Sequence, residues 1–421
     1  MLSKTDNEAL TRVGPGSLMG ELWRRFWVPA LLPGELPDPD CPPVRLRLLG
    51  EDLVAFRDST GKVGVVVEAC PHRGASLFFG RNEESGLRCV YHGWKFDLTG
   101  ACVDMPNEPA ESNFKHKIRA TAYPAAEWGG TIWVYMGPPE LQPGLPEMEW
   151  CMVPAEHRHM SKWLYKANFM QGLEGEVDSA HISFLHSWMD PTASPSYRPG
   201  RQRTRTTDGS PHLTVQDTDY GFIYGARRNT EDGQHYWRLT PYMLPVFTII
   251  PGPTWPLNCR IYIPIDDENT WALNAMYNPE TPLTDDQRAF MDSGVANVPR
   301  LKPGTFIPQA SPDNDYFMDR ELQRTKSFAG IPGLNEQDLA VVQSMGAIYD
   351  RTHEHLGTTD MAVIAARRML LRLARELAAG KQPFAALHPE VFRARPLDIV
   401  TPTAELSHLL QEQKEHIVSR F

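Results

Sequence analysis

Two cysteines and two histidines in residues 70–94 constrain this chain more than any other feature. The stretch CPHRGASLFFGRNEESGLRCVYHGW spaces them as Cys-x-His, then sixteen residues, then Cys-x-x-His. Each half supplies one residue of each kind: Cys70 with His72, and Cys89 with His92. Thiolate and imidazole together suit zinc or an iron–sulfur cluster. The sequence therefore predicts a metal centre held by two segments of the chain.

The pairing of ligand types favours the cluster. A [2Fe–2S] cluster with two cysteines on one iron and two histidines on the other takes one ligand of each kind from each loop. Mixed zinc sites more often pair cysteine with cysteine and histidine with histidine. Gly74 and Gly93 lie beside the ligands, where they let backbone N–H groups approach bridging sulfides. A structural zinc site is the alternative.

A second group of possible ligands lies in residues 172–187, GLEGEVDSAHISFLHS. On a helix Asp178 and His181 share a face, and His186 lies about 140° further round, so local distortion would help both imidazoles reach one ion. Two imidazoles and one carboxylate form the facial triad of non-haem Fe(II) oxygenases, which leaves positions open for O2 and substrate. The pattern therefore indicates a mononuclear iron site.

These motifs resemble a known family. CPHRGASL and CVYHGWKFDLTG resemble the cluster loops of Rieske aromatic-ring oxygenases, and Asp-x-x-His-x-x-x-x-His is similar to the mononuclear-iron motif of the same enzymes. The resemblance runs nearly end to end and is closest to the phthalate dioxygenase-like branch of terminal oxygenase α subunits. It implies a Rieske [2Fe–2S] cluster on the four residues of 70–94 and Fe(II) on His181 and His186.

The resemblance gives Asp178 a different role. In that family the aspartate before the histidines does not bind iron but contacts a Rieske histidine across a subunit boundary. Asp178 is therefore expected to be the inter-subunit electron bridge. Glu174 and Glu176 compete weakly for this role, and an ordinary surface acid is the structural alternative.

The third iron ligand is expected far along the chain, in GLNEQDLAVVQSMGAIYDR, residues 333–351. If Asn335 caps a helix, Asp338 falls in its first turn and faces inward. The stretch resembles the segment that supplies the ligand aspartate in the phthalate dioxygenase-like branch, so we predict Asp338 as the ligand. Glu336 and Asp350 are the alternatives, and an acid near a helix start can also simply compensate the helix dipole.

Periodicity divides the chain. Residues 35–140 alternate apolar and polar positions around turn signals such as DSTGK, which predicts an all-β Rieske domain. The proline-rich stretch after residue 136 is a plausible linker. Residues 141–421 mix strands such as RIYIPI with helices such as residues 358–380, which predicts a mixed α+β catalytic domain with an antiparallel sheet. Residues 17–31 have helical spacing, and residues 1–34 are expected to pack on the catalytic domain as a helical segment.

The composition of the chain limits the classes of binding partner and the cellular compartment that we expect. A net charge of −10 without a basic run disfavours nucleic acid. No stretch reaches the roughly 18 apolar residues that span a bilayer, and the first residues lack an apolar signal core. Six cysteines in 421 residues do not make a disulfide framework. We therefore expect a cytoplasmic protein without a membrane or nucleic-acid partner.

The paired centres predict an electron path. Electrons from NAD(P)H would pass singly through a separate flavin and iron–sulfur reductase to the Rieske cluster and then to the iron, which activates O2. The resemblance implies α subunits only, as a homotrimer or as stacked trimers.

The substrate is less constrained. The resemblance implies an aromatic carboxylate, either hydroxylated on the ring (mono- or dihydroxylation) or O-demethylated. Arg238, in HYWRLTPYM, is expected to bind the carboxylate, with an ion pair to a core acid as the alternative. Ser179 could touch a polar substrate group, and Arg227 and Arg228 are weaker candidates. A non-aromatic or larger fused substrate stays open, as does a zinc-stabilised binding protein without redox activity.

Overall fold

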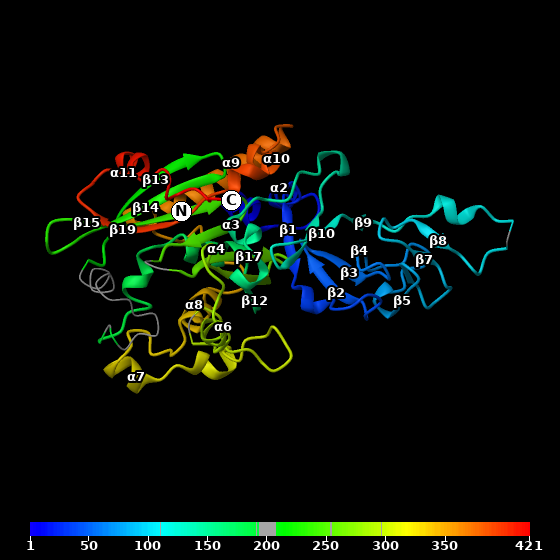
Figure 1. Ribbon diagram of the computed structural model, residues 1–421, viewed down its shortest axis with the longest axis horizontal. Coiled ribbons are helices and arrows are strands. Elements are labelled where there is room, and N and C mark those ends of the chain that lie inside the picture. The colour runs from blue at the N-terminus through cyan, green and yellow to red at the C-terminus, as the bar shows by residue number, and fades with distance from the viewer. Residues whose placement is uncertain (110, 191, 193–207, 253–254, 296) are drawn as a thin grey trace.

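The computed structural model describes residues 1–109, 111–190, 192, 208–252, 255–295 and 297–421. Figure 1 shows a small all-β part at one end of the long axis and a larger part built on a broad sheet at the other. This confirms the predicted α+β class, with a β domain followed by an antiparallel sheet with helices. In these ranges no helix is both long enough and apolar enough to cross a bilayer.

Two four-stranded antiparallel sheets form the small part. One runs β2 (Val44–Leu48), β3 (Glu51–Arg57), β4 (Val63–Val67) and β9 (Ala122–Tyr123). The other runs β5 (Arg81–Glu83), β6 (Gly86–Arg88), β7 (Lys95–Phe96) and β8 (Cys102–Asp104). Apolar side chains from both sheets, including Phe56, Leu87 and Phe96, share one core. The loops after β4 and β6 carry the cysteine–histidine pairs, so this core holds the two loops together.

A three-stranded sheet of β1 (Trp27–Leu31), β11 (Thr131–Tyr135) and β10 (Ala125–Trp128) joins the two parts. It corrects the helix expected over residues 17–31, because the helix α2 covers only Leu18–Trp23. All residues of β1 are buried, and Trp27 pairs with Tyr135 across the sheet. A short run that is apolar on both faces suits a buried strand as well as a buried helix, and periodicity does not separate the two.

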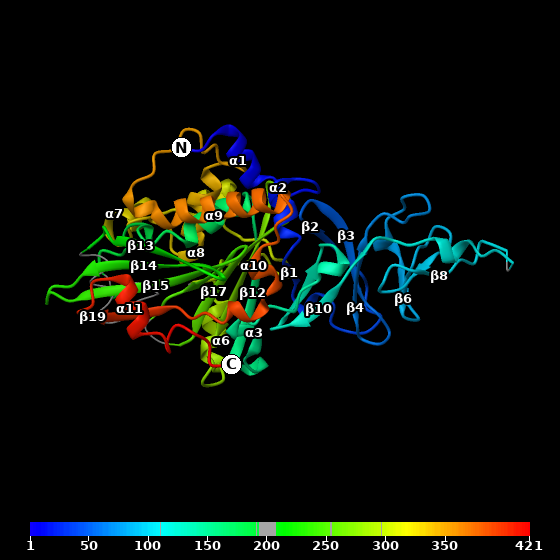
Figure 2. The same cartoon turned by 90° about the horizontal axis from the view of Figure 1, so that it is seen from above.

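The larger part is built on an eight-stranded antiparallel sheet. Its strands are β12 (Arg158–Tyr165), β13 (His212–Thr218), β14 (Gly221–Asn229), β15 (His235–Met243), β16 (Phe247–Ile250), β17 (Leu257–Pro264), β18 (Thr270–Tyr277) and β19 (Leu397–Thr401). The α-helices are α1 (Lys4–Thr11), α2, α3 (Glu149–Met152), α4 (Phe169–Glu176), α6 (Asp285–Asp292), α7 (Arg320–Thr325), α8 (Leu334–Ser344), α9 (Met361–Ala378), α10 (Phe384–Leu387) and α11 (Leu406–Glu412). Figure 2 shows α9 along one side of the sheet, with α1 and α2 beside it.

The packing of α4 on β17 positions the candidate site. A Cβ atom on Gly172 of α4 would lie 2.4 Å from the ring of Tyr262 on β17, so only glycine allows this approach. Because side chains alternate along a strand, Asn258, Arg260 and Tyr262 share one face of β17. All three line the cavity below α4 and α8.

Candidate active site

The two cysteine–histidine loops have the same backbone geometry. The N–H of Gly74 donates to the carbonyl of Cys70 at 2.8 Å, and that of Gly93 donates to the carbonyl of Cys89 at 3.0 Å. Both glycines have positive φ, +73° and +78°. Such turns favour glycine because a Cβ atom is strained there. The repeated turn presents one cysteine and one histidine from each loop.

The four side chains come together. The rings of His72 and His92 lie 4.4 Å apart, and Trp94 from the second loop stacks on His72 at 4.3 Å. Cys70 and Cys89 are buried free thiols, and burial raises the pKa of Cys70 to about 11. Among the residues described, Nδ1 of His92 is buried and has no hydrogen-bond partner. Two buried thiols beside two neighbouring imidazoles are a donor set that fits a [2Fe–2S] cluster.

Gly93→Ala is expected to lose the cluster more readily than Gly74→Ala. A Cβ atom at position 93 would lie 2.6 Å from Cγ of Pro106, whereas one at position 74 meets nothing within 4 Å. Both variants carry a left-handed backbone cost of about 1–2 kcal/mol, and only Gly93→Ala adds the clash. Cluster content per chain, measured by absorbance and sulfide, compares them directly. Equal retention would show that the Gly93 turn does not depend on this close packing.

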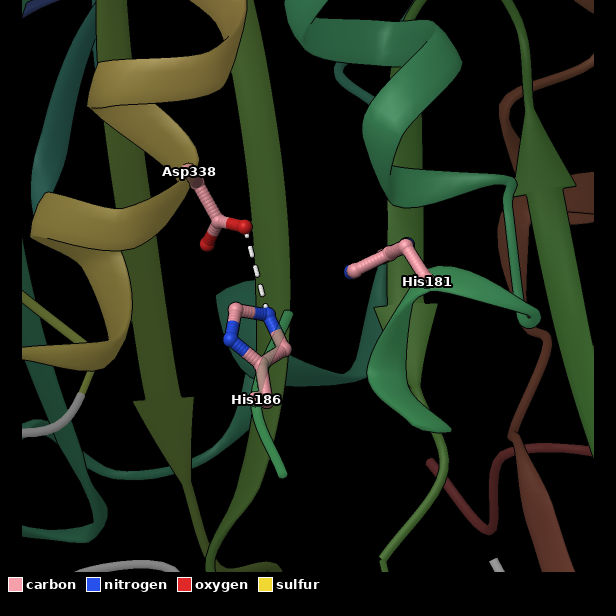
Figure 3. A group of neighbouring side chains, drawn as sticks. All are labelled: His181, His186 and Asp338. Carbon is pink, nitrogen blue, oxygen red and sulfur yellow. Dashed lines mark ion pairs between the residues drawn. The ribbon is translucent and has the colours of Figure 1, made fainter. Parts of the chain in front are cut away.

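His181, His186 and Asp338 gather around one point, as Figure 3 shows. One candidate ligand atom from each lies within 4.8 Å of the others. Nε2 of His186 is 3.2 Å from Oδ1 of Asp338, and the two imidazole rings are 5.0 Å apart. Two imidazoles and one carboxylate are the donor set of a non-haem Fe(II) triad, so these residues fit that ion.

The backbone around the histidines differs from the expected helix. The helix α4 ends at Glu176, and His181 begins a separate short 3-10 helix, His181–Ser183. Asp178 causes the break, because its side chain accepts the N–H of Ala180 at 2.7 Å and so starts a new turn. This interruption is the distortion that lets both imidazoles face one ion.

The place of Asp338 in its helix also differs slightly from the expectation. Gly333 rather than Asn335 caps α8, so Asp338 opens the second turn of the helix rather than lying in the first. The helix therefore begins two residues earlier than expected. Asp338 still lies on the inward face, where it contacts His186.

Electrostatics favour a cation at this point. Burial raises the pKa of Asp338, but the facing imidazoles of His186 and His181 and the cation of Arg260 outweigh burial and hold that pKa below its usual value. Burial lowers the pKa of His181, but the carboxylates of Asp178 and Asp338 outweigh it and raise that pKa. Ionised acids facing imidazoles in a partly buried site attract a positive ion, here either a proton or a metal.

The alternative iron ligands point elsewhere. Glu336 is buried and paired with Arg300 at 2.9 Å. Asp350 is exposed and lies 3.7 Å from His353, whose side chain is 84% exposed. His355 is exposed and lies in the lining of the cavity below α4 and α8.

The two other acids considered for the inter-subunit bridge, Glu174 and Glu176, are both paired with side chains of the same chain. Glu174 is paired with Arg351 at 2.8 Å and with Arg367 at 2.7 Å. Glu176 accepts a hydrogen bond from Tyr262 at 2.9 Å and lies 3.3 Å from Arg260. These contacts hold α4 in place on the large part.

A cavity of about 600 Å³ adjoins the triad. Arg238 and Ser179 line it together with Asp178, and Arg238 is 7% exposed. Arg228 is engaged elsewhere, because it donates to the backbone oxygen of Ser179 at 2.7 Å. Arg227 donates to the carbonyl of Ala404 at 3.1 Å, outside the cavity. The structure thus brings Arg238, rather than its neighbours on β14, to the cavity that holds the triad.

Sequence reasoning did not single out two contacts at this site. Gln337 accepts a hydrogen bond from His186 at 2.6 Å, and Arg260 lies beside the partly buried Glu176. Gln337 directly precedes Asp338, and this adjacency is the one signal that the sequence offers for it. Arg260 carries no local signal, because its partners come from distant segments.

Fold and site together define a Rieske-type oxygenase. The Rieske [2Fe-2S] domain family matches residues 26–122, and the LigXa C-terminal domain like family matches residues 134–400. The chain therefore belongs to the Rieske non-haem iron oxygenases, as a terminal oxygenase subunit of the phthalate dioxygenase-like branch, which confirms the predicted resemblance.

Individual relatives agree with this assignment. The chain is 41% identical to the Phthalate 4,5-dioxygenase oxygenase subunit of Pseudomonas putida, over 90% of this chain and 88% of the relative. It is 30% identical to the 5,5'-dehydrodivanillate O-demethylase oxygenase subunit of Sphingobium sp., over 99% of this chain and 91% of the relative. The structure of the QL mutant of Pseudomonas putida CBB5 NdmA with theobromine shares the fold at 18% identity, with a TM-score of 0.62 over 92% of this chain and 99% of that one.

Proposed function

We propose that this chain is the terminal oxygenase component that oxygenates an aromatic carboxylate, using O2 and electrons from NAD(P)H delivered by a separate flavin and iron–sulfur reductase. The observation that carries the proposal is one cavity lined by His181, His186, Asp338 and the buried Arg238. An arginine beside a candidate O2-activating centre suits a substrate that carries an anion.

Each group has a distinct role in this proposal. Cys70, His72, Cys89 and His92 would hold the Rieske cluster, and His181, His186 and Asp338 would hold Fe(II). When bound, the cluster supplies one-electron storage and Fe(II) supplies O2 activation. The chain itself orients the ligands and binds the substrate anion. Ser179, whose Oγ is buried at the cavity wall, would contact a polar group of the substrate.

Asp178 would carry electrons between subunits. Figure 1 places β5–β8, which flank the cluster loops, at one end of the long axis, whereas α4 and α8 lie well away from that end, within the larger part. A path within one chain would therefore be long. The Asp178 side chain is 25% exposed, and its Oδ2 lies 3.4 Å from Nδ1 of His181. A head-to-tail homotrimer, alone or as stacked trimers, would bring the next subunit's Rieske histidine to this carboxylate.

Arg238→Met is expected to weaken the binding of aromatic acids by about 2–5 kcal/mol, the cost of removing one partner of a buried charged pair. Neutral analogues of the same acids should lose much less. Dissociation constants for matched acid and amide ligands give the comparison. Arg227→Met, on the neighbouring strand and outside the cavity, is the control and should bind both ligands as the parent does. Equal losses for acid and amide with Arg238→Met would assign Arg238 to the fold instead.

Products decide between hydroxylation and demethylation. The purified oxygenase, a phthalate-type reductase and NADH are incubated with benzoic acids that carry carboxyl, chloro or methoxy substituents. Formaldehyde with loss of one methyl group identifies O-demethylation, and added oxygen on an intact carbon skeleton identifies ring hydroxylation. Turnover of fused or non-aromatic compounds alone would replace the aromatic-acid proposal.

We propose the cytoplasm as the location of the protein. The six free cysteines are compatible with this reducing compartment.

A further inference from the structure

The geometry points to Gln337 as the residue that positions His186 for iron, an inference that rests on the proposed iron site. His186 lies in a turn beyond the 3-10 helix rather than in a helix or strand. Oε1 of Gln337 lies 2.6 Å from Nδ1 of His186. The Gln337 side chain is fully buried on α8, directly before Asp338.

The orientation of the Gln337 amide follows from its other contact. Nε2 of Gln337 lies 2.7 Å from the carbonyl oxygen of Ile331. A carbonyl oxygen only accepts hydrogen bonds, so the amide nitrogen must face Ile331 and the amide oxygen must face His186. The oxygen in turn only accepts, so Nδ1 of His186 must carry the proton. The lone pair of this imidazole is then on Nε2, the atom that faces Asp338.

The same amide ties together the segments around the ligand. The N–H of Phe328 donates to the carbonyl of Ser187, next to His186, at 3.1 Å. The amide of Gln337 donates to the carbonyl of Ile331, which lies three residues after Phe328 in the same segment. One side chain of α8 therefore fixes both the ring of His186 and the segment that supports its backbone.

The two histidines thus have different outer partners. His181 faces the carboxylate of Asp178, whereas His186 faces the neutral amide of Gln337. The helix α8 supplies Asp338 directly and sets the tautomer of His186 through Gln337. Partners of this kind orient ligand imidazoles and typically change metal affinity 10–100-fold. Gln337 is accordingly a positioning residue for His186.

The test uses the cluster-loaded protein and Fe(II) as the probe. Gln337→Met keeps the length but removes both the acceptor and the donor. Gln337→Glu restores an acceptor oxygen for His186 and, as the neutral acid, an O–H that can donate to the carbonyl of Ile331. Gln171→Met is the control, because Gln171 is also a buried glutamine that joins α4 to the carbonyls of Val342 and Gly346 without touching a ligand. The readouts are the Fe(II) dissociation constant of the mononuclear site and the EPR spectrum of its complex with nitric oxide.

Gln337→Met is expected to weaken Fe(II) binding by about 10–100-fold and to give a broadened, heterogeneous nitrosyl spectrum. Gln337→Glu should recover most of the affinity, and Gln171→Met should match the parent. Parent-like binding and spectra in Gln337→Met would overturn the inference, as would equal losses in the Glu and Met variants or in Gln171→Met. If the parent itself binds no mononuclear Fe(II), the proposed function fails first.

Discussion

Asp178→Asn is expected to lower product formation by at least about 100-fold while both metal sites stay filled, since the loss of an outer partner of a ligand commonly costs 10–100-fold and here also cuts the electron path. The substitution keeps the size and the oxygen that caps Ala180, but removes the negative charge beside His181. The reductase should still reduce the Rieske cluster. Electrons should then remain on the cluster, because no carboxylate joins His181 to the Rieske histidine of the next subunit.

Stopped-flow absorbance of the cluster, followed by single-turnover product analysis, separates the two steps. Asp190→Asn is the matched control, because Asp190 makes the same turn, accepting the N–H of Thr192 at 2.9 Å, but stands on the exposed surface. Turnover of Asp178→Asn near the parent rate would refute the bridging role. Loss of its mononuclear iron would instead make Asp178 a part of the metal site.

Asp338→Ala is expected to empty the mononuclear site and reduce turnover to background, while the Rieske spectrum stays unchanged. One of three protein ligands is removed, and the two histidines that remain lack the negative charge that balances Fe(II). Iron content above that of the cluster, together with product per added electron, measures the effect.

Asp350→Ala is the control for that variant, since Asp350 is the exposed acid in the same part of the chain. It should retain iron and turnover. If Asp338→Ala kept its iron and Asp350→Ala lost it, the third ligand would be Asp350 and α8 would have only a structural role.

The ligand loops could be predicted from the sequence because their chemistry is local. A cysteine, a histidine and a glycine within five residues, occurring twice, define a turn and its metal ligands together. The histidine pair is almost as local. Asp338 could be proposed as a ligand only through the family resemblance, because about 150 residues separate it from His186 and spacing alone does not join them.

The incorrect expectations have physical causes. Residues 17–31 were expected to be helical, but Trp27 and its neighbours are buried on both faces in β1 and carry no period that marks a strand. The helix expected through Asp178 fails because the aspartate accepts a backbone N–H two residues later. The contacts of Gln337 and Arg260 need α8, β17 and α4 in place, so they are properties of the tertiary structure.

Metal and sulfide analysis of the purified protein, combined with EPR after one-electron reduction, tests the central claim most directly. The account predicts brown protein with about three iron atoms and about two acid-labile sulfides per chain, a Rieske signal of low average g value, and one Fe(II) that Asp338→Ala removes. Colourless protein with stoichiometric zinc and no sulfide would contradict it.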